Sequence, residues 1–210
     1  MELDAADSSP HPADSSPHPA GPGARRMPGP GQSERHVEPD AHRDFMSCFP
    51  TGVAVVTTVG CDGSPRGLTC SSLSSVSLSP PVLSVCMGVW SRTLAAVRDH
   101  GSFAVNILGV QGLAAAEIFA SAAPGHFDRV EWRPADATGL PRLDDTIAFA
   151  ACRLIATYGV GDHIVAFGEV MAVECSEYIP LLYGLRQFAA WPGEGFRATL
   201  ADPSITRAGP

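Results

Sequence analysis

The chain has 210 residues, of which 45% are hydrophobic and 17% are charged, and its formal net charge is −8 at pH 7. This length suits one domain with a substantial core and is short for two. The acidic balance disfavours nucleic acid or an anionic membrane surface as a partner, because phosphate groups are held mainly by Lys and Arg. We therefore expect the partner to be a small molecule or another protein.

The cysteines and the chain's first residues bear on where the protein works. Six cysteines are spread along the chain without a C-x-x-C pair or a His/Cys cluster at zinc spacing. We expect them to be reduced and mostly buried, and we expect no metal site. The N-terminus lacks the basic start and apolar core of a signal peptide, and no apolar run is long enough to span a membrane. These features predict a soluble, cytoplasmic protein.

A Pro-, Ser- and Gly-rich tail occupies the first 40 residues. The seven residues from Asp7 to Ala13 recur unchanged from Asp14 to Ala20, and Met27 is an alternative start of the chain. Two copies do not make a solenoid, and this composition buries too little apolar area to order itself. We predict that residues 1–40 are disordered, that the folded domain spans residues 41–191, and that residues 192–210 form a second tail.

The first half of the predicted domain consists mostly of short strands. A helix at residues 41–48, stopped by Pro50, precedes an apolar, β-branched strand at residues 51–59. An extended segment at residues 66–78 and an apolar strand at residues 82–87 follow. The short gaps between these strands favour antiparallel pairing.

The second half alternates helices with longer strands. Helices are predicted at residues 93–99 and 111–121, on either side of an apolar strand at 103–108. Two long strands, at residues 148–158 and 164–175, are joined by a hairpin-like loop, GVGDH. The number and spacing of the strands predict a mainly β fold, a small antiparallel barrel with helices at its openings.

The most unusual segment is GLTCSSLSSVSLSPP at residues 67–81, which contains six serines and a threonine. Small hydroxyls at this density indicate a surface for an oxygen-rich ligand, although Ser and Thr also satisfy turns and helix caps. If the segment is one extended strand, Thr69 and Ser71 share a face and Cys70, Ser72 and Ser74 share the other. Backbone amides of the same strand would then contact the ligand as well.

Two further places could position a ligand. At Pro50-Thr51-Gly52-Val53, glycine permits a close backbone approach and Thr51 offers a hydroxyl, although an ordinary turn explains the same residues. Ser91-Arg92-Thr93 opens a predicted helix, where unpaired N–H groups, hydroxyls and a guanidinium together favour an anion such as phosphate. The chain has no G-x-G-x-x-G after a strand, P-loop, G-x-S-x-G or H-E-x-x-H motif. Chemistry carried by a bound cofactor is the economical alternative.

Taken together, these motifs make the chain resemble the short-chain flavin reductases, the reductase partners of two-component flavin-dependent monooxygenases. The resemblance covers residues 44–188. It rests on FPTGVAVVTT (49–58), GLTCSSLSSVSLSPP (67–81), SRTL (91–94), FAVNIL (103–108), GDH (161–163) and PLLY (180–183), in the family's order.

The resemblance implies an antiparallel Greek-key split β-barrel of the FMN-binding type, with a few flanking helices, and a homodimer. It also implies reduction of FAD or FMN by NADH or NADPH, with the reduced flavin diffusing to a separate monooxygenase. Two alternatives stay open: a flavin-holding reductase of ferric complexes or another acceptor, and a non-catalytic flavin- or haem-binding protein on the same barrel.

The family's motifs also imply roles for individual residues. Thr51, Gly52 and Val53 would approach the ring and ribityl chain of the flavin, and Ser91 and Arg92 would hold phosphate. Gly161, Asp162 and His163 match the family's nicotinamide-nucleotide signature, so His163 would position the nicotinamide; a plain hairpin turn is the alternative. The other expected cofactor-binding residues are Pro50, Thr69, Cys70, Ser71, Ser72, Ser75, Phe103 and Arg186.

This chain departs from the family's common pattern at three places. Cys70-Ser71 stands where Ala-Asn or Ala-Ser is frequent, Leu73 replaces a usual Phe, and Trp90 lies where small or charged residues are common. These changes leave the choice between FMN and FAD open. The choice between NADH and NADPH is open as well, because spacing identifies no basic site for a 2′-phosphate.

Overall fold

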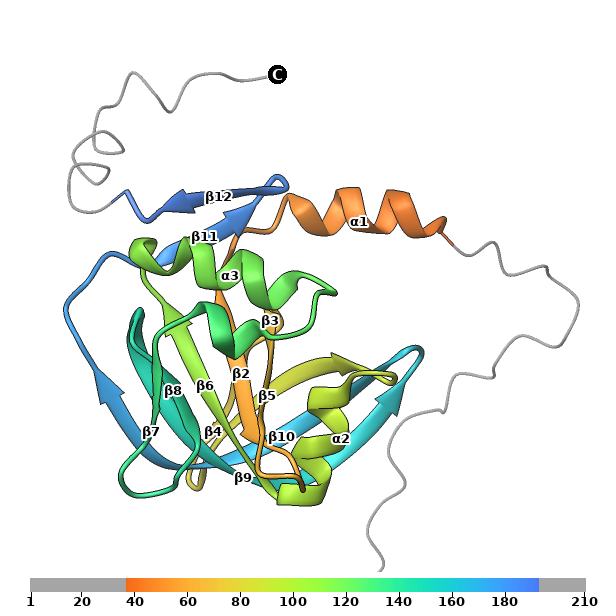
Figure 1. Cartoon of the computed structure of the whole chain (residues 1–210). Helices are drawn as coiled ribbons and strands as arrows, with labels where there is room; N and C mark the ends of the chain where they lie inside the picture. The colour runs from red at the N-terminus through yellow and green to blue at the C-terminus, as the bar shows by residue number, and fades with distance from the viewer. Residues whose placement is uncertain (1–36, 193–210) are drawn as a thin grey trace, which may run out of the picture. The chain divides into compact units, whose positions relative to one another are not determined.

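The computed structural model describes residues 37–192, a mainly β fold with antiparallel sheets and three α-helices within that range (Figure 1). The two predicted tails, residues 1–40 and 192–210, lie outside the described residues except for residues 37–40 and 192. Helix α1 (Pro39–Ser47) begins two residues before the predicted domain boundary, with proline in its first turn, where the missing N–H has no helical partner to lose.

Seven strands form the main sheet, in the order β3-β2-β6-β9-β10-β5-β4, and every neighbouring pair is antiparallel. Its strands are β2 (Ala54–Val59), β3 (Pro65–Cys70), β4 (Ser74–Leu78), β5 (Pro81–Gly88), β6 (Ser102–Leu108), β9 (Thr146–Val160) and β10 (His163–Cys175). A three-stranded sheet joins β1 (Thr51–Gly52), β11 (Leu181–Gly184) and β12 (Gln187–Ala190), and a hairpin joins β7 (Trp132–Pro134) to β8 (Pro141–Leu143).

Helices α2 (Arg92–His100) and α3 (Leu113–Ala120) both pack against β2 and β3 (Figure 1). Short 3₁₀ turns, η1 (Val110–Gly112) and η2 (His126–Arg129), flank α3. As predicted, α2 starts at a serine cap: Ser91 Oγ accepts the Leu94 N–H at 3.3 Å. Gly101 ends the helix in the left-handed conformation, with φ of 75°.

The serine-rich segment is not one extended strand, and that prediction is wrong. β3 ends at Cys70 and β4 begins at Ser74, and the two strands lie at opposite edges of the main sheet. Ser72 explains the break, because its hydroxyl accepts the Cys86 N–H at 2.9 Å and also contacts Cys70 Sγ at 3.1 Å. A side chain has replaced a strand-to-strand backbone bond, so the alternating-face prediction does not continue past β3.

Several short elements were not predicted from the sequence. Strands β7, β8, β11 and β12 have only three or four residues each, too few to show a periodic pattern.

The GVGDH loop is tighter than expected: Val160 pairs with His163, and Gly161 takes a φ of 59° in the two-residue turn between them. Both long strands therefore extend to the hairpin tip.

Three buried clusters lie around the main sheet in the described residues, and the two larger ones position the site. One gathers Phe103 and Val105 of β6 with residues of β5, β10 and α2. The other places Ala116 and Phe119 of α3 against β2, β11 and Leu143. A buried polar link crosses β6: Asn106 donates to Val55 O at 3.2 Å and accepts the Leu143 N–H at 2.9 Å. Because the polar groups of this link are hydrogen-bonded, they fix the strand register without leaving a buried polar atom unpaired.

The prediction that the cysteines are mostly buried is wrong, although all six are free thiols. Cys70 and Cys152 are buried, Cys86 is half-buried, and Cys48, Cys61 and Cys175 are exposed. Burial raises the pKa of the Cys152 thiol to about 12, so this thiol stays protonated.

Within residues 37–192, no helix has the length and apolar character needed to cross a membrane, and no three His, Cys, Asp or Glu gather as a metal site.

Candidate active-site cleft

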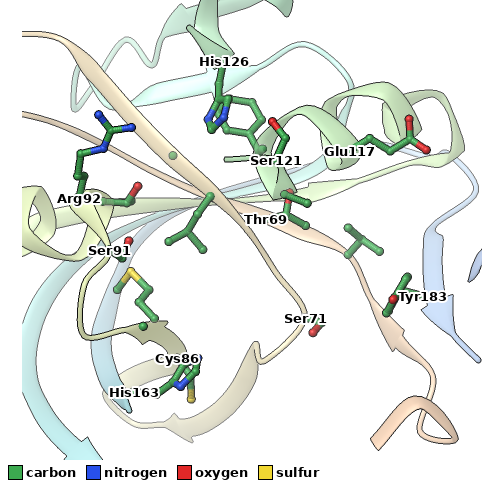
Figure 2. Close-up of a pocket in the computed structure, with 18 of the residues that line it drawn as sticks. Thr69, Ser71, Cys86, Ser91, Arg92, Glu117, Ser121, His126, His163 and Tyr183 are labelled. Atoms are coloured by element: carbon green, nitrogen blue, oxygen red, sulfur yellow. The ribbon is translucent and has the colours of Figure 1, made fainter. Parts of the chain in front are cut away.

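A cleft of about 810 Å³ opens between β3, β5, the start of α2, the end of α3 and the β9–β10 hairpin (Figure 2). Its volume lies within the range of about 300–1,000 Å³ that small-molecule sites occupy. Six of the expected site residues line it: Val53, Thr69, Ser71, Ser91, Arg92 and His163. The fold therefore brings together residues that are up to 110 positions apart in the chain.

The start of α2 has the features of a place for an anion. Ser91 caps the helix, and Arg92 is its first residue, with an exposed side chain that lines the cleft. The capping hydroxyl of Ser91 still has a proton to donate, since in the cap it acts as acceptor. The helix dipole and the guanidinium both favour negative charge at this position.

Hydroxyl groups and open backbone also line the cleft. Thr69 Oγ1 donates to Ala116 O at 2.7 Å, which fixes the hydroxyl and leaves its lone pairs free to accept. Ser71 is exposed in the bend after β3. At Gly88, the last residue of β5, an added Cβ would meet no atom within 4 Å. The backbone of Gly88 is therefore open to a ligand.

His163 lines the cleft from the tip of the β9–β10 hairpin. Its Nδ1 lies 2.8 Å from the Asp162 carboxylate, and this hydrogen bond lowers the pKa of Asp162 below its usual range. Asp162 O in turn accepts the Val89 N–H at 3.0 Å, which ties the hairpin tip to the end of β5. The imidazole is thereby oriented at the cleft while half of its side chain stays exposed.

Three expected cofactor-binding residues lie in a separate groove of about 710 Å³ beside α1. Thr51, Ser72 and Arg186 line this groove, and Ser71 and Tyr183 line both the groove and the cleft. Arg186 forms an ion pair with Asp44 of α1, so its charge is already partnered. Thr51, Ser72 and Arg186 therefore line the groove and not the cleft.

The remaining expected residues do not line the cleft. Phe103 is completely buried in the core, where β6 directs its ring at Gly168. The Cys70 side chain is also buried in that cluster, and burial raises the pKa of its thiol. Pro50, Gly52, Ser75, Gly161 and Asp162 line neither the cleft nor the groove. These residues lie within the family's motifs in the sequence, but in the structure they do not line either cavity.

The cleft also contains residues that the sequence did not single out. Glu117, Phe119 and Ser121 come from the end of α3, and His126 from η2. From β5 come Cys86, Met87 and Gly88, and the three-stranded sheet contributes Tyr183 and Phe188. The alanine-rich pattern of α3 indicated a packing helix and gave no sign that its last turn faces a ligand site.

Comparisons with known proteins agree on one family. A family model described as "Flavin reductase like domain" matches residues 46–192. A flavin reductase (NADPH) of Lentzea aerocolonigenes is 48% identical over 161 residues, 76% of this chain and 94% of that protein. The reductase subunit HsaB of a flavin-dependent monooxygenase from Rhodococcus jostii is 35% identical over 153 residues, 72% of this chain and 77% of that protein. The solved NADH:FAD oxidoreductase SgcE6 of Streptomyces globisporus, in complex with NAD and FAD fragments, has a TM-score of 0.70 at 31% identity, covering 76% of this chain and 98% of its own.

Proposed function

The chain belongs to the flavin reductase like family, and from this premise we propose how its cleft performs the reaction. The protein is an NAD(P)H-dependent flavin reductase that reduces FAD or FMN and supplies free reduced flavin to a partner monooxygenase. One observation carries the assignment of the site: the hydroxyls of Thr69 and Ser71, the start of α2 and His163 all line a single cleft.

The residues of the cleft fit a flavin. Thr69, Ser71 and the open backbone at Gly88 offer the mixed donors and acceptors that the polar edge of an isoalloxazine ring requires. Phe119 and Met87 supply apolar surface for the ring. Ser91 and Arg92 would hold the phosphate that ends the ribityl chain.

The chemistry of the bound ligands is hydride transfer from C4 of the nicotinamide to N5 of the flavin. The protein's contribution is proximity and orientation, because no proton has to be moved by a side chain during that transfer. His163, held by Asp162, would orient the nicotinamide ring in the cleft. Cys152 and Cys70 take no part, since both thiols are buried and protonated.

Steady-state oxidation of NADH and NADPH, with FAD, FMN or riboflavin added to the purified protein, tests the function. Turnover that requires added flavin supports the reductase. Turnover without added flavin, but dependent on ferric complexes, would instead identify a flavin-holding reductase. Absence of turnover with every flavin contradicts the proposal and favours a non-catalytic flavin- or haem-binding protein.

His163→Ala is expected to raise the KM for NADH about tenfold, with the Kd for flavin changed less than about twofold. In this assignment the imidazole contacts only the nicotinamide, so its removal weakens the binding of NADH and not that of the flavin. Initial-rate kinetics and flavin fluorescence titration measure the two constants. His100→Ala is the matched control, because His100 lies at the far end of α2 and does not line the cleft. An unchanged KM for NADH would remove His163 from the site.

We also propose that the antiparallel sheets form a split β-barrel and that two chains pair as a homodimer. Large apolar side chains are exposed on the distal parts of β9 and β10, where Ile155, Met171 and Val173 are 49–64% exposed. Helix α1 has no buried residue, and Phe45 on it is 73% exposed. Exposed apolar area of this extent marks an interface in many proteins.

Sedimentation of the full chain tests the pairing and is expected to give the mass of a dimer. The double substitution Met171→Glu with Val173→Glu puts two carboxylates on one exposed strand face and is expected to give monomers at micromolar concentration. Glu177→Gln, which alters the charge at a nearby exposed position without adding a carboxylate, is the control. A wild-type protein that sediments as a monomer would contradict the proposal.

A further inference from the structure

Two thiols gather around one hydroxyl where the bend after β3 meets β5, and we call Cys70, Ser72 and Cys86 the thiol cluster. Ser72 Oγ lies 3.1 Å from Cys70 Sγ, accepts the Cys86 N–H at 2.9 Å and donates to Cys86 O at 3.4 Å. Strands β3 and β5 are not hydrogen-bonded neighbours in the main sheet, yet they contact each other. The fold thus brings together two cysteines from separate strands.

The two thiols of the cluster differ in their access to solvent. Cys86 is half-buried and lines the cleft, whereas Cys70 is buried (Figure 2). Burial raises the pKa of the Cys70 thiol, and the nearby Cys86 thiol raises it further, so Cys70 stays protonated. A small oxidant that enters the cleft therefore meets Cys86 first, with Cys70 behind it.

Cys86 also lies near the histidine of the cleft. Cys86 pairs with Val165 across β5 and β10, and Gly88 pairs with His163. Cys86 and His163 are therefore diagonal neighbours on one face of these two strands. Because both line the cleft, a change of the Cys86 thiol takes place where the ligands of the enzyme bind.

An accessible thiol with a second thiol beside it is the arrangement that peroxide-responsive proteins use. The oxidant follows from the product of this enzyme: reduced flavin that no monooxygenase consumes gives two electrons to O₂, which yields oxidised flavin and H₂O₂. One oxygen of H₂O₂ then passes to the Cys86 sulfur, giving a sulfenic acid, and the other leaves as water. The Cys70 sulfur displaces that hydroxyl, which leaves with the Cys70 proton as a second water and forms the S–S bond.

We propose that peroxide joins Cys70 and Cys86 in a reversible disulfide and that this bond weakens flavin binding. The Ser72 hydroxyl lies against both residues, so the two sulfurs approach each other only when the bend at residues 71–73 moves. Ser71 belongs to that bend and lines the cleft, so it moves with the bond. The inference rests on the proposed function for the source of peroxide. Its consequence is that the reductase slows when its reduced flavin is not used.

Peroxide treatment of the full chain tests the switch without turnover, in a background in which the exposed Cys48, Cys61 and Cys175 are replaced by Ser. Non-reducing peptide mapping is expected to find one cross-link, between Cys70 and Cys86. Flavin fluorescence titration is expected to show the Kd for FMN raised about tenfold, with recovery in dithiothreitol. FMN added before peroxide is expected to protect the pair, because Cys86 lines the cleft that FMN fills.

Two variants of the same background separate the disulfide from general oxidation. Cys70→Ala leaves Cys86 without its partner, so peroxide should produce no cross-link and a smaller, separate loss of FMN binding. Cys152→Ala removes a buried thiol outside the cluster and should leave the cross-link unchanged.

Three results would overturn the switch and leave the flavin reductase intact: absence of the cross-link, a cross-link with an unchanged Kd for FMN, or an equal reversible loss of FMN binding in Cys70→Ala. A chain that forms the cross-link but binds no flavin before oxidation would overturn the proposed function and the switch together.

Discussion

Gly88→Val is expected to lower kcat/KM for flavin reduction about 100-fold while the free energy of unfolding changes by less than about 1 kcal/mol. A Cβ at residue 88 meets no atom within 4 Å, so the folded chain accepts the side chain without a clash. Residue 88 is the last of β5, where a β-branched side chain suits the strand. The same open space belongs to the cleft, so the valine methyl groups occupy volume that the flavin ring requires.

Initial rates with FAD and FMN, together with urea unfolding, separate the two effects. Gly88→Ala provides a graded control, because one methyl group reaches less far into the cleft and is expected to cost less activity. An unfolding midpoint close to that of the wild type shows that the loss is local. If Gly88→Val kept the wild-type KM for both flavins, the ring would lie elsewhere in the cleft.

Phe103→Ala is expected to lower the free energy of unfolding by about 3–5 kcal/mol, a large part of the total for a domain of this size. The ring is completely buried in β6 and is among the largest buried side chains of the described residues. It packs directly on Gly168, where an added Cβ would lie only 2.5 Å from Phe103 Cζ. The backbone around the ring cannot move to fill the cavity, because β6, which carries Phe103, and β10, which carries Gly168, are both hydrogen-bonded to β9.

The same substitution tests the role of Phe103 as a cofactor-binding residue. Urea unfolding gives the stability loss, and fluorescence titration at low temperature gives the Kd for FMN of the folded fraction, which is expected to stay within about twofold of the wild type. Phe103→Leu, which retains most of the volume, should cost less stability. A large rise in the Kd for FMN with little change in stability would return Phe103 to the flavin site.

Local signals predicted most of the larger elements correctly. The serine cap and glycine end of α2, and the long β9–β10 hairpin, depend on residues close together in the chain, whose preferences are physical and local. The break between β3 and β4 could not be predicted in this way. It depends on a bond between Ser72 and Cys86, which are 14 residues apart, and that bond exists only once β5 lies beside the end of β3.

The candidate site divides along the same line. Sequence motifs alone identified the family, because each motif is a short run with its own chemistry. They also predicted site residues of which Thr69, Ser71, Ser91, Arg92 and His163 line one cleft. The tertiary structure decided which of these residues face the cleft. The alternation of side chains along a strand shows which residues share a face, but not whether that face is turned toward the core or the cleft. Only the packing of the sheet directs Phe103 and Cys70 into the core.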